Sequence, residues 1–225
     1  MYDISDCDFK KDDVIETPLQ LAKFIYNKVK RKAFKNVLDL GSSRGNLTYY
    51  FKNKIGLDIE DDYKNNFNKF ICKDFLTTTK EDFEDFEIDC IVSNPPFSDL
   101  LSFQFLEHSL KLFPNIPHIF IVPNYILDNS KNRSNDLKKY NITKIVKLDP
   151  HIFKASNVAI HCSIIFLNLN FKDNKVYDYF YLEKEIKGKR RSIYLTKEEE
   201  EILKDLKVKN FSKFIKGLIK EKANK

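Results

Sequence analysis

The sequence predicts an α/β fold in which a mostly parallel sheet is covered on both faces. Seven short apolar runs, each bounded by turn residues and rich in β-branched side chains, have the length of strands. Helical patterns separate several of these runs, and such alternation is typical of parallel sheets. With 225 residues, 42% of them apolar, the chain can bury a sizeable core. The expected strands lie at 36–40, 55–59, 70–72, 88–93, 118–122, 142–148 and 161–169.

Two clear helical patterns accompany these strands. Thr17-Pro18 opens a segment whose apolar residues recur at helical spacing, and proline is favoured in the first turn of a helix. We expect this helix at 18–33. A second apolar stripe predicts a helix at 100–113, and a weaker pattern lies at 131–140.

The net charge of the chain, +6, lies in its last quarter. Residues 171–225 hold 16 Lys and Arg against 10 Asp and Glu, so residues 1–170 are neutral. This division predicts a main domain at 1–170 and a small basic extension at 171–225. The positive excess fits a polyanion partner and a Lys-rich solvated surface equally well.

Composition disfavours several classes of protein. No apolar run approaches the ~18 residues that span a bilayer, and the first residues lack a basic region followed by an apolar one. We therefore expect a cytoplasmic protein with no membrane partner. The cysteines are far apart and lack histidines at ligand spacing, so we expect core thiols and neither a zinc site nor a disulfide. They are Cys7, Cys72, Cys90 and Cys162.

The loop after the first expected strand has the composition of a nucleotide-binding turn. Gly41 and Gly45 allow a ligand to approach the backbone closely. We expect the residues after Gly45 to be helical, which would point backbone NH groups at that ligand. The alternative is an ordinary turn between a strand and a helix.

Carboxylates mark the ends of the first three expected strands, at Asp39, Asp58 and Asp74. Because the carboxyl ends of parallel strands share one edge of a sheet, these side chains are expected to line one cleft. Asp58 can accept hydrogen bonds from two ribose hydroxyls. Three carboxylates would repel a pyrophosphate, so they favour a ligand that carries a ribose and an amine.

The segment Asn94-Pro95-Pro96-Phe97 ends the fourth expected strand and predicts a chemistry. Two consecutive prolines stiffen the backbone. The carboxamide oxygen of Asn94 and the carbonyl oxygen of Pro95 can then accept both hydrogen bonds of one NH2 group, while Phe97 covers a flat ring. Such an arrangement draws a conjugated amino group toward a reactive, tetrahedral geometry. The alternative is a segment that only ends the strand.

With Thr17-Pro18 ahead of these motifs, residues 14–170 resemble the S-adenosylmethionine-dependent amino-methyltransferases, in particular the N6-adenine DNA methyltransferases. Residues 94–97 match the catalytic Asn/Asp-Pro-Pro-aromatic motif of that family. The resemblance implies a Rossmann-like methyltransferase fold, with a mostly parallel seven-stranded sheet that contains an antiparallel strand. It also implies methyl transfer from S-adenosylmethionine to the N6 amino group of adenine in DNA.

The resemblance assigns roles to individual residues as well. It implies that the segment Glu16-Thr17-Pro18 contacts the methionine part of the cofactor. Asp58 would bind the ribose, and Asp74 the amino group of the cofactor's adenine. The other implied cofactor contacts are Asp39, Gly41 and Gly45 beneath the cofactor and Ile59 and Phe75 beside its adenine ring.

Substrate contacts follow from the same resemblance. Phe97 and Phe153 would stack on a target base that has left its helix. Independently of the resemblance, the basic turn of the extension predicts that Lys187, Lys189, Arg190 and Arg191 bind phosphates, and a solvated turn is the alternative interpretation. The resemblance implies no metal, because the sulfonium of the cofactor is already activated.

The sequence departs from the family in two places. Ser43 stands where the family has a further glycine, and we expect it to be tolerated through a negative φ. The 55-residue extension leaves little room for a target-recognition domain, so a partner subunit is expected to supply recognition. Three alternatives stay open: adenine in RNA, a protein glutamine, and a catalytically silent subunit of a methyltransferase complex.

Overall fold

The computed structural model describes residues 15–128, 137–153, 160–173 and 176–181. The chain divides into two compact units, Met1–Glu183 and Lys184–Lys225, and all described residues belong to the first. The helices are α1 (Leu19–Val29), α2 (Leu101–Leu112) and α3 (Asn124–Asp128). The strands are β1 (Val37–Leu40), β2 (Lys54–Asp58), β3 (Lys69–Cys72), β4 (Cys90–Ser93), β5 (His118–Pro123), β6 (Ile142–Leu148), β7 (Cys162–Leu167) and β8 (Tyr177–Phe180).

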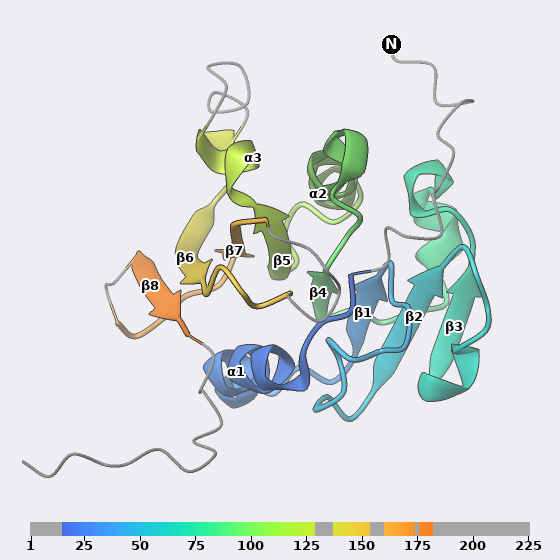
Figure 1. Cartoon of the computed structure of the whole chain (residues 1–225). Coiled ribbons are helices and arrows are strands. Elements are labelled where there is room, and N and C mark those ends of the chain that lie inside the picture. Colours follow the sequence, from blue (N-terminus) through green and yellow to red (C-terminus); the bar gives the residue numbers. More distant parts are fainter. Residues whose placement is uncertain (1–14, 129–136, 154–159, 174–175, 182–225) are drawn as a thin grey trace, which may run out of the picture. The chain divides into compact units, whose positions relative to one another are not determined.

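These strands form one sheet in the order β3-β2-β1-β4-β5-β7-β6-β8 (Figure 1). β7 runs antiparallel to both of its neighbours, and every other pairing is parallel. The predicted fold is therefore confirmed, including its antiparallel strand. β8 adds an eighth strand at the end of the order, in a segment that the charge distribution assigned to the basic extension.

All seven expected strands are present, within one or two residues at most ends. The two clear helical patterns are also confirmed, as α1 with a following 3-10 turn and as α2. The weaker pattern at 131–140 falls mostly outside the described residues. The expected helix after Gly45 is wrong, because residues 46–51 form turns with bonds from Tyr49 N to Asn46 O and from Phe51 N to Thr48 O.

Helices pack on both faces of the sheet, α1 on one and α2 and α3 on the other (Figure 1). Leu21, Ile25 and Val29 place α1 in the first apolar core. The turn that replaces the expected helix covers the same face, because Leu47 and Phe51 are buried in that core. α2 forms the second core with several phenylalanines, including Phe75, Phe83, Phe103, Phe105 and Phe120.

The carboxyl ends of β1, β2 and β4 lie side by side, because these strands are parallel neighbours. The Ser93 hydroxyl donates to the carbonyl of Leu40 at 2.7 Å and ties β4 to β1 at this edge. Directly beyond these ends the chain continues as the Gly41 loop, residues 59–68 and the Asn94 segment. The fold therefore gathers the predicted motifs at one edge of the sheet.

Candidate active site

A cavity of about 440 Å³ opens at this edge, a volume within the range of small-molecule sites. Its walls come from the N-terminal segment, the loops after β1, β2, β3 and β4, and one side chain of α2. Most of the predicted cofactor residues reach it. The predicted residues that line it are Gly41, Asp58, Ile59, Asp74, Phe75, Asn94 and Pro96.

The other predicted residues lie elsewhere. Thr17 and Asp39 line a small hollow of about 20 Å³ that shares Gly41 and Asn94 with the main cavity. The remaining five described residues line neither space, and the four basic ones lie outside the described residues. The five are Pro18, Gly45, Pro95, Phe97 and Phe153, and the four are Lys187, Lys189, Arg190 and Arg191.

The loop after β1 is held by its own backbone. Gly41 N and Ser42 N both donate to the Leu57 carbonyl, at 2.9 and 3.1 Å, and Ser43 N donates to Asp58 Oδ2 at 2.7 Å. These amides are therefore engaged within the protein, which makes the loop a poor phosphate cradle. Ser43 has a φ of +42°, so the expectation of a negative φ there is wrong. The bond to Asp58 helps to hold Ser43 in this unfavourable conformation.

The two glycines of the loop are required for different reasons. Both have left-handed backbones, with φ of +66° at Gly41 and +76° at Gly45. A Cβ on Gly41 would meet nothing closer than 3.7 Å, whereas one on Gly45 would lie 2.9 Å from the Phe67 ring. Gly41 lines the cavity, and Gly45 packs closely against the Phe67 ring.

Asp58 and Asp39 differ sharply in environment. Asp58 is partly exposed, and it accepts from Ser43 N and from Glu60 N while lining the cavity. Asp39 is buried at 1% exposure and accepts from the Thr48 hydroxyl at 2.9 Å. Burial raises the pKa of Asp39 well above its ordinary value, and the nearby Asp58 charge adds to the increase. Asp58 therefore lines the cavity with a carboxylate whose two oxygens can each accept a further hydrogen bond, whereas Asp39 holds the base of the loop.

Asp74 and Phe75 form the wall on the β3 side. Asp74 caps a short 3-10 helix by accepting from Leu76 N at 2.9 Å, which fixes its carboxylate at the cavity. Phe75 is almost completely buried against Phe105 and His108, with ring centroids 5.0 and 4.9 Å away. The wall therefore offers a fixed acceptor beside a flat apolar surface.

Asn94 has an unusual distribution of hydrogen bonds. Its amide nitrogen donates to the Ile15 carbonyl at 2.7 Å and to the Thr17 hydroxyl at 3.2 Å. Its carbonyl oxygen is buried and accepts no hydrogen bond from the described part of the chain. Because Ile15 offers only a carbonyl acceptor there, the orientation of the carboxamide is fixed. Asn94 also lines the cavity, so its unsatisfied carbonyl oxygen belongs to a residue at the wall of the site.

Phe97 and Phe153 contact each other but do not present a face to the cavity. Their rings meet edge to face at 6.1 Å and 75°, and their exposures are only 5% and 1%. The Tyr125 hydroxyl also donates to the Phe97 carbonyl at 2.7 Å, which holds that backbone in place. Stacking on a target base therefore requires these rings to become more exposed than they are here.

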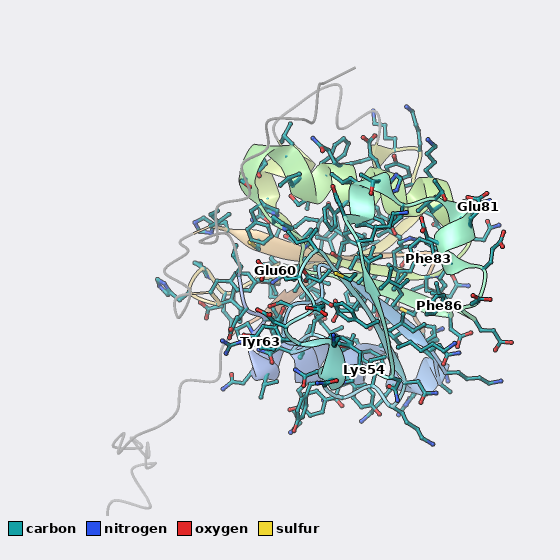
Figure 2. The ribbon with its side chains drawn as sticks, turned by 90° about the vertical axis from the view of Figure 1, so that its right-hand side faces the viewer. Lys54, Glu60, Tyr63, Glu81, Phe83 and Phe86 are labelled. Atoms are coloured by element: carbon teal, nitrogen blue, oxygen red, sulfur yellow. The ribbon has the colours of Figure 1, made fainter. Side chains whose placement is uncertain are left out.

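The sequence interpretation included Glu16 in the segment near the methionine part of the cofactor, but it missed Arg44 and Tyr63 beside it at the cavity mouth. Arg44 donates to the Tyr63 hydroxyl at 3.2 Å, lies 5.3 Å from the centroid of that ring, and pairs with Glu16 at 3.0 Å. All three line the cavity. Figure 2 shows Tyr63 and Glu60 together, on the side opposite Phe83 and Phe86. An arginine within a glycine loop was the available signal, but nothing in the sequence links it to Tyr63.

The cavity is predominantly acidic. Its lining contains the carboxylates of Glu16, Asp58, Glu60, Asp62 and Asp74 but only two cationic side chains. Both cations are paired, Arg44 with Glu16 and Lys73 with Asp82 at 2.8 Å. The field in the cavity therefore favours a cationic ligand over a phosphate.

None of the three described cysteines lines the cavity, and Cys7 lies outside the described residues. Cys90 and Cys162 are buried, and burial raises their pKa values, to about 12 for Cys162. Cys72 is exposed, so the expectation of a core thiol is wrong there. Within the described ranges no three His, Cys, Asp or Glu side chains are grouped to hold a metal. No helix in the same ranges combines the length and apolarity needed to cross a membrane.

Comparison with solved structures identifies the fold as the Rossmann-like methyltransferase fold. A type I restriction-modification methyltransferase subunit from Streptococcus thermophilus matches 88% of this chain, with a TM-score of 0.58 and 18% identity, and 55% of its own length is covered. A candidate class I S-adenosylmethionine-dependent methyltransferase from Listeria monocytogenes matches 77% of this chain and 67% of its own, with a TM-score of 0.53 and 18% identity.

A third match is a modification subunit of a candidate type I restriction enzyme from Vibrio vulnificus. It has a TM-score of 0.52 and 14% identity over 90% of this chain and 54% of its own. The chain thus spans about half the length of the two restriction-modification subunits. No protein-family model and no curated protein matches the sequence.

Proposed function

We propose that this chain is an S-adenosylmethionine-dependent methyltransferase that acts on the N6 amino group of adenine in DNA. The observation that carries the proposal is the buried, unsatisfied carbonyl oxygen of Asn94. Leaving such an acceptor unpaired costs about 1–3 kcal/mol, and an amino group that enters the cavity would remove that cost. Ile15 and Thr17 hold the carboxamide so that its acceptor, and not its donor, lacks a partner among the described residues.

The cavity suits the proposed cofactor in size and charge. Asp58 would accept from the ribose hydroxyls, and Asp74 from the adenine amino group, with Ile59 and Phe75 beside the ring. Thr17 and Pro18 would lie near the methionine part, with Asp39, Gly41 and Gly45 shaping the loop beneath it. The acidic lining favours the positive charge of a sulfonium. When bound, the cofactor supplies an activated methyl group.

The Arg44–Glu16 pair gives the cavity a second type of recognition. The guanidinium of Arg44 and the carboxylate of Glu16 lie 3.0 Å apart. Each can give up its bond to the other and bind the oppositely charged group of an amino-acid zwitterion. The carboxylate of the methionine part would bind Arg44, and its ammonium group would bind Glu16. Both side chains are about half exposed, so the pair can open without desolvating a charge.

Asn94 and Pro95 would then orient the target. Their two carbonyl oxygens would accept both hydrogens of the adenine amino group and localise its lone pair on nitrogen. In the transfer, the new N–C bond would form as the S–C bond broke, and one N6 proton would leave to solvent. Phe97 would support the base, and Phe153 would join it if the rings separate. No covalent nucleophile is needed, because orientation and electrostatics supply the acceleration.

The choice of DNA rests on the type of enzyme that the structure resembles. Two of the matched structures are restriction-modification subunits. Adenine in RNA is the second candidate, because none of the predicted substrate residues senses a 2′-hydroxyl. A partner subunit would supply target recognition, because the two matched proteins are themselves subunits of restriction-modification systems. A catalytically silent subunit would have no use for the Asn94 acceptor.

The test is substitution of Asn94 by alanine, with Asn115→Ala as the matched control on an exposed loop. We expect Asn94→Ala to reduce methyl transfer at least a hundredfold, the scale of losing one transition-state hydrogen bond, with binding of S-adenosylhomocysteine nearly unchanged. Asn115→Ala should behave as the wild type. Full activity of Asn94→Ala would refute the amino-group mechanism.

A further inference from the structure

We propose that Tyr63 is a positioning residue for the carboxylate of the cofactor, because it keeps the guanidinium of Arg44 at the cavity mouth when Glu16 turns to the ammonium group. This inference rests on the proposed function and deepens it, since it says what makes the site select a ligand with a carboxylate. Neither the sequence motifs nor the resemblance pointed to Tyr63.

Tyr63 and Arg44 belong to different loops that meet at the cavity. Arg44 follows β1 and Tyr63 follows β2, and both line the cavity. Arg44 Nε donates to the Tyr63 hydroxyl at 3.2 Å, and the guanidinium carbon lies 5.3 Å from the centroid of the same ring. The tyrosine therefore contacts the arginine through its hydroxyl and through its ring.

The backbone around this contact is held as well. Asn66 Nδ2 donates to the Arg44 carbonyl at 2.9 Å, and Asn66 N donates to the Tyr63 carbonyl at the same distance. The Phe67 ring packs closely against Gly45, the residue after Arg44. The segment that carries Tyr63 thus fixes the main chain of Arg44 while Tyr63 holds its side chain.

The contacts of Arg44 leave one edge of its guanidinium unused. Tyr63 and Glu16 both approach Nε, at 3.2 and 3.0 Å. The two terminal amino groups of Arg44 donate no hydrogen bond to the residues that the structure describes. A pair of amino groups at the end of a guanidinium can bind both oxygens of a carboxylate. The cavity therefore offers a carboxylate a position with two parallel hydrogen bonds.

Tyr63 becomes important when the Arg44–Glu16 pair opens. Arg44 then loses its anionic partner, and its side chain is 54% exposed, so without another contact it would be free to rotate. Tyr63 is uncharged, so its contacts with Arg44 persist without competing for the charge of the arginine. Because the guanidinium is already in position, less conformational entropy is lost when a carboxylate binds.

The acidic lining of the cavity makes the position of Arg44 decisive. Five carboxylates line the cavity, and the second cation, Lys73, is held by Asp82, which does not line it. A carboxylate on the ligand is therefore repelled unless Arg44 is in place beside it. A ligand with an ammonium group and no carboxylate has no such need. Tyr63 therefore affects selection between these two kinds of ligand.

The experiment compares S-adenosylhomocysteine with its decarboxylated analogue, because the two ligands share the adenosine, the sulfur and the ammonium group and differ only in the carboxylate. Calorimetry measures both affinities for the wild type, Tyr63→Phe, which loses only the hydroxyl, and Tyr63→Leu, which also loses the ring. Tyr49→Phe is the matched control, at a position with 60% exposure that lines neither the cavity nor the small hollow. Thermal unfolding is followed in parallel.

Tyr63→Phe should bind S-adenosylhomocysteine about threefold more weakly than the wild type, the scale of one exposed hydrogen bond. Tyr63→Leu should lose about as much affinity as Arg44→Met, and neither tyrosine variant should change binding of the decarboxylated analogue. In the Arg44→Met background, Tyr63→Leu should cause no further loss, because the tyrosine acts through the arginine. A merely structural role would give neither this selectivity nor this coupling.

Unchanged binding of S-adenosylhomocysteine by Tyr63→Leu, an equal loss of affinity for both ligands, or additive losses in the double variant would each overturn the proposal. The expected affinities in a protein that transfers no methyl group to DNA or RNA would instead refute only the proposed function. Absence of S-adenosylhomocysteine binding by the wild type would refute both.

Discussion

Replacement of the loop glycines tests how the structure builds the floor of the cavity. Gly41 and Gly45 both have positive φ, so alanine at either position incurs roughly 1–2 kcal/mol of backbone strain, partly offset by a less flexible unfolded chain. Only Gly45→Ala would also force the Phe67 ring to move, because its Cβ would lie 2.9 Å from that ring. Overpacking of this kind costs about 1–3 kcal/mol.

The two variants should therefore differ in stability by a measurable amount. We expect Gly41→Ala to lose about 1 kcal/mol and Gly45→Ala about 2–4 kcal/mol. In a protein of this size each kcal/mol shifts Tm by about 2–4 °C. Gly56→Ala separates the cost of overpacking from the cost of backbone strain. Its Cβ would clash with Phe67 and Phe70 at 2.7 and 2.8 Å, but Gly56 has no positive φ.

The assay is thermal and urea unfolding of each variant, alone and combined with Phe67→Leu. The smaller side chain should remove most of the extra cost of Gly45→Ala and leave the cost of Gly41→Ala unchanged. If Gly45→Ala is no more destabilising than Gly41→Ala, the packing of residues 59–68 against the loop is not as described. If Phe67→Leu does not reduce the difference, Phe67 is not its cause.

Two further predictions concern charged residues near the cavity. Arg44→Met should weaken binding of S-adenosylhomocysteine severalfold but leave binding of methylthioadenosine, which lacks the amino-acid part, unchanged. Calorimetry measures both affinities, and Arg31→Met is the control. An equal loss of affinity for the two ligands would show that the Arg44–Glu16 pair does not bind the amino-acid part. Because the pKa of Asp39 is raised in the folded state, its ionisation destabilises the protein as pH rises through that pKa. Asp39→Asn should therefore be at least as stable as the wild type at pH 7, and the difference in Tm between the two proteins should shrink on acidification toward pH 4. A difference in Tm that grows on acidification would contradict the raised pKa of Asp39.

Local patterns in the sequence were sufficient to predict the architecture. The strands are short β-branched runs, and parallel pairing necessarily brings their carboxyl ends to one edge. Asp58, Asp74 and Asn94 could therefore be assigned to a common cleft without a structure. The Thr-Pro segment could also be placed at the start of α1, because proline has a defined place in a first turn.

Features that depend on tertiary contacts could not be predicted in the same way. The positive φ of Ser43 depends on a bond to Asp58, fifteen residues away in the sequence. The turns after Gly45 replace a helix in the 13-residue connection from β1 to β2, where Leu47 and Phe51 are buried in the first core. The mutual burial of Phe97 and Phe153 arises from chain segments far apart, so an aromatic at either position could equally have been exposed.

The most direct test of the central claim is to identify the methylated product. The wild-type protein is incubated with S-adenosylmethionine labelled on its methyl group and, separately, with duplex DNA, single-stranded DNA, RNA and protein extract, and each is digested for nucleoside or amino-acid analysis. The account predicts label in N6-methyladenine from DNA, and none when Asn94→Ala replaces the wild type. Label on a cytosine or on protein, or no label together with no binding of the cofactor, would contradict it.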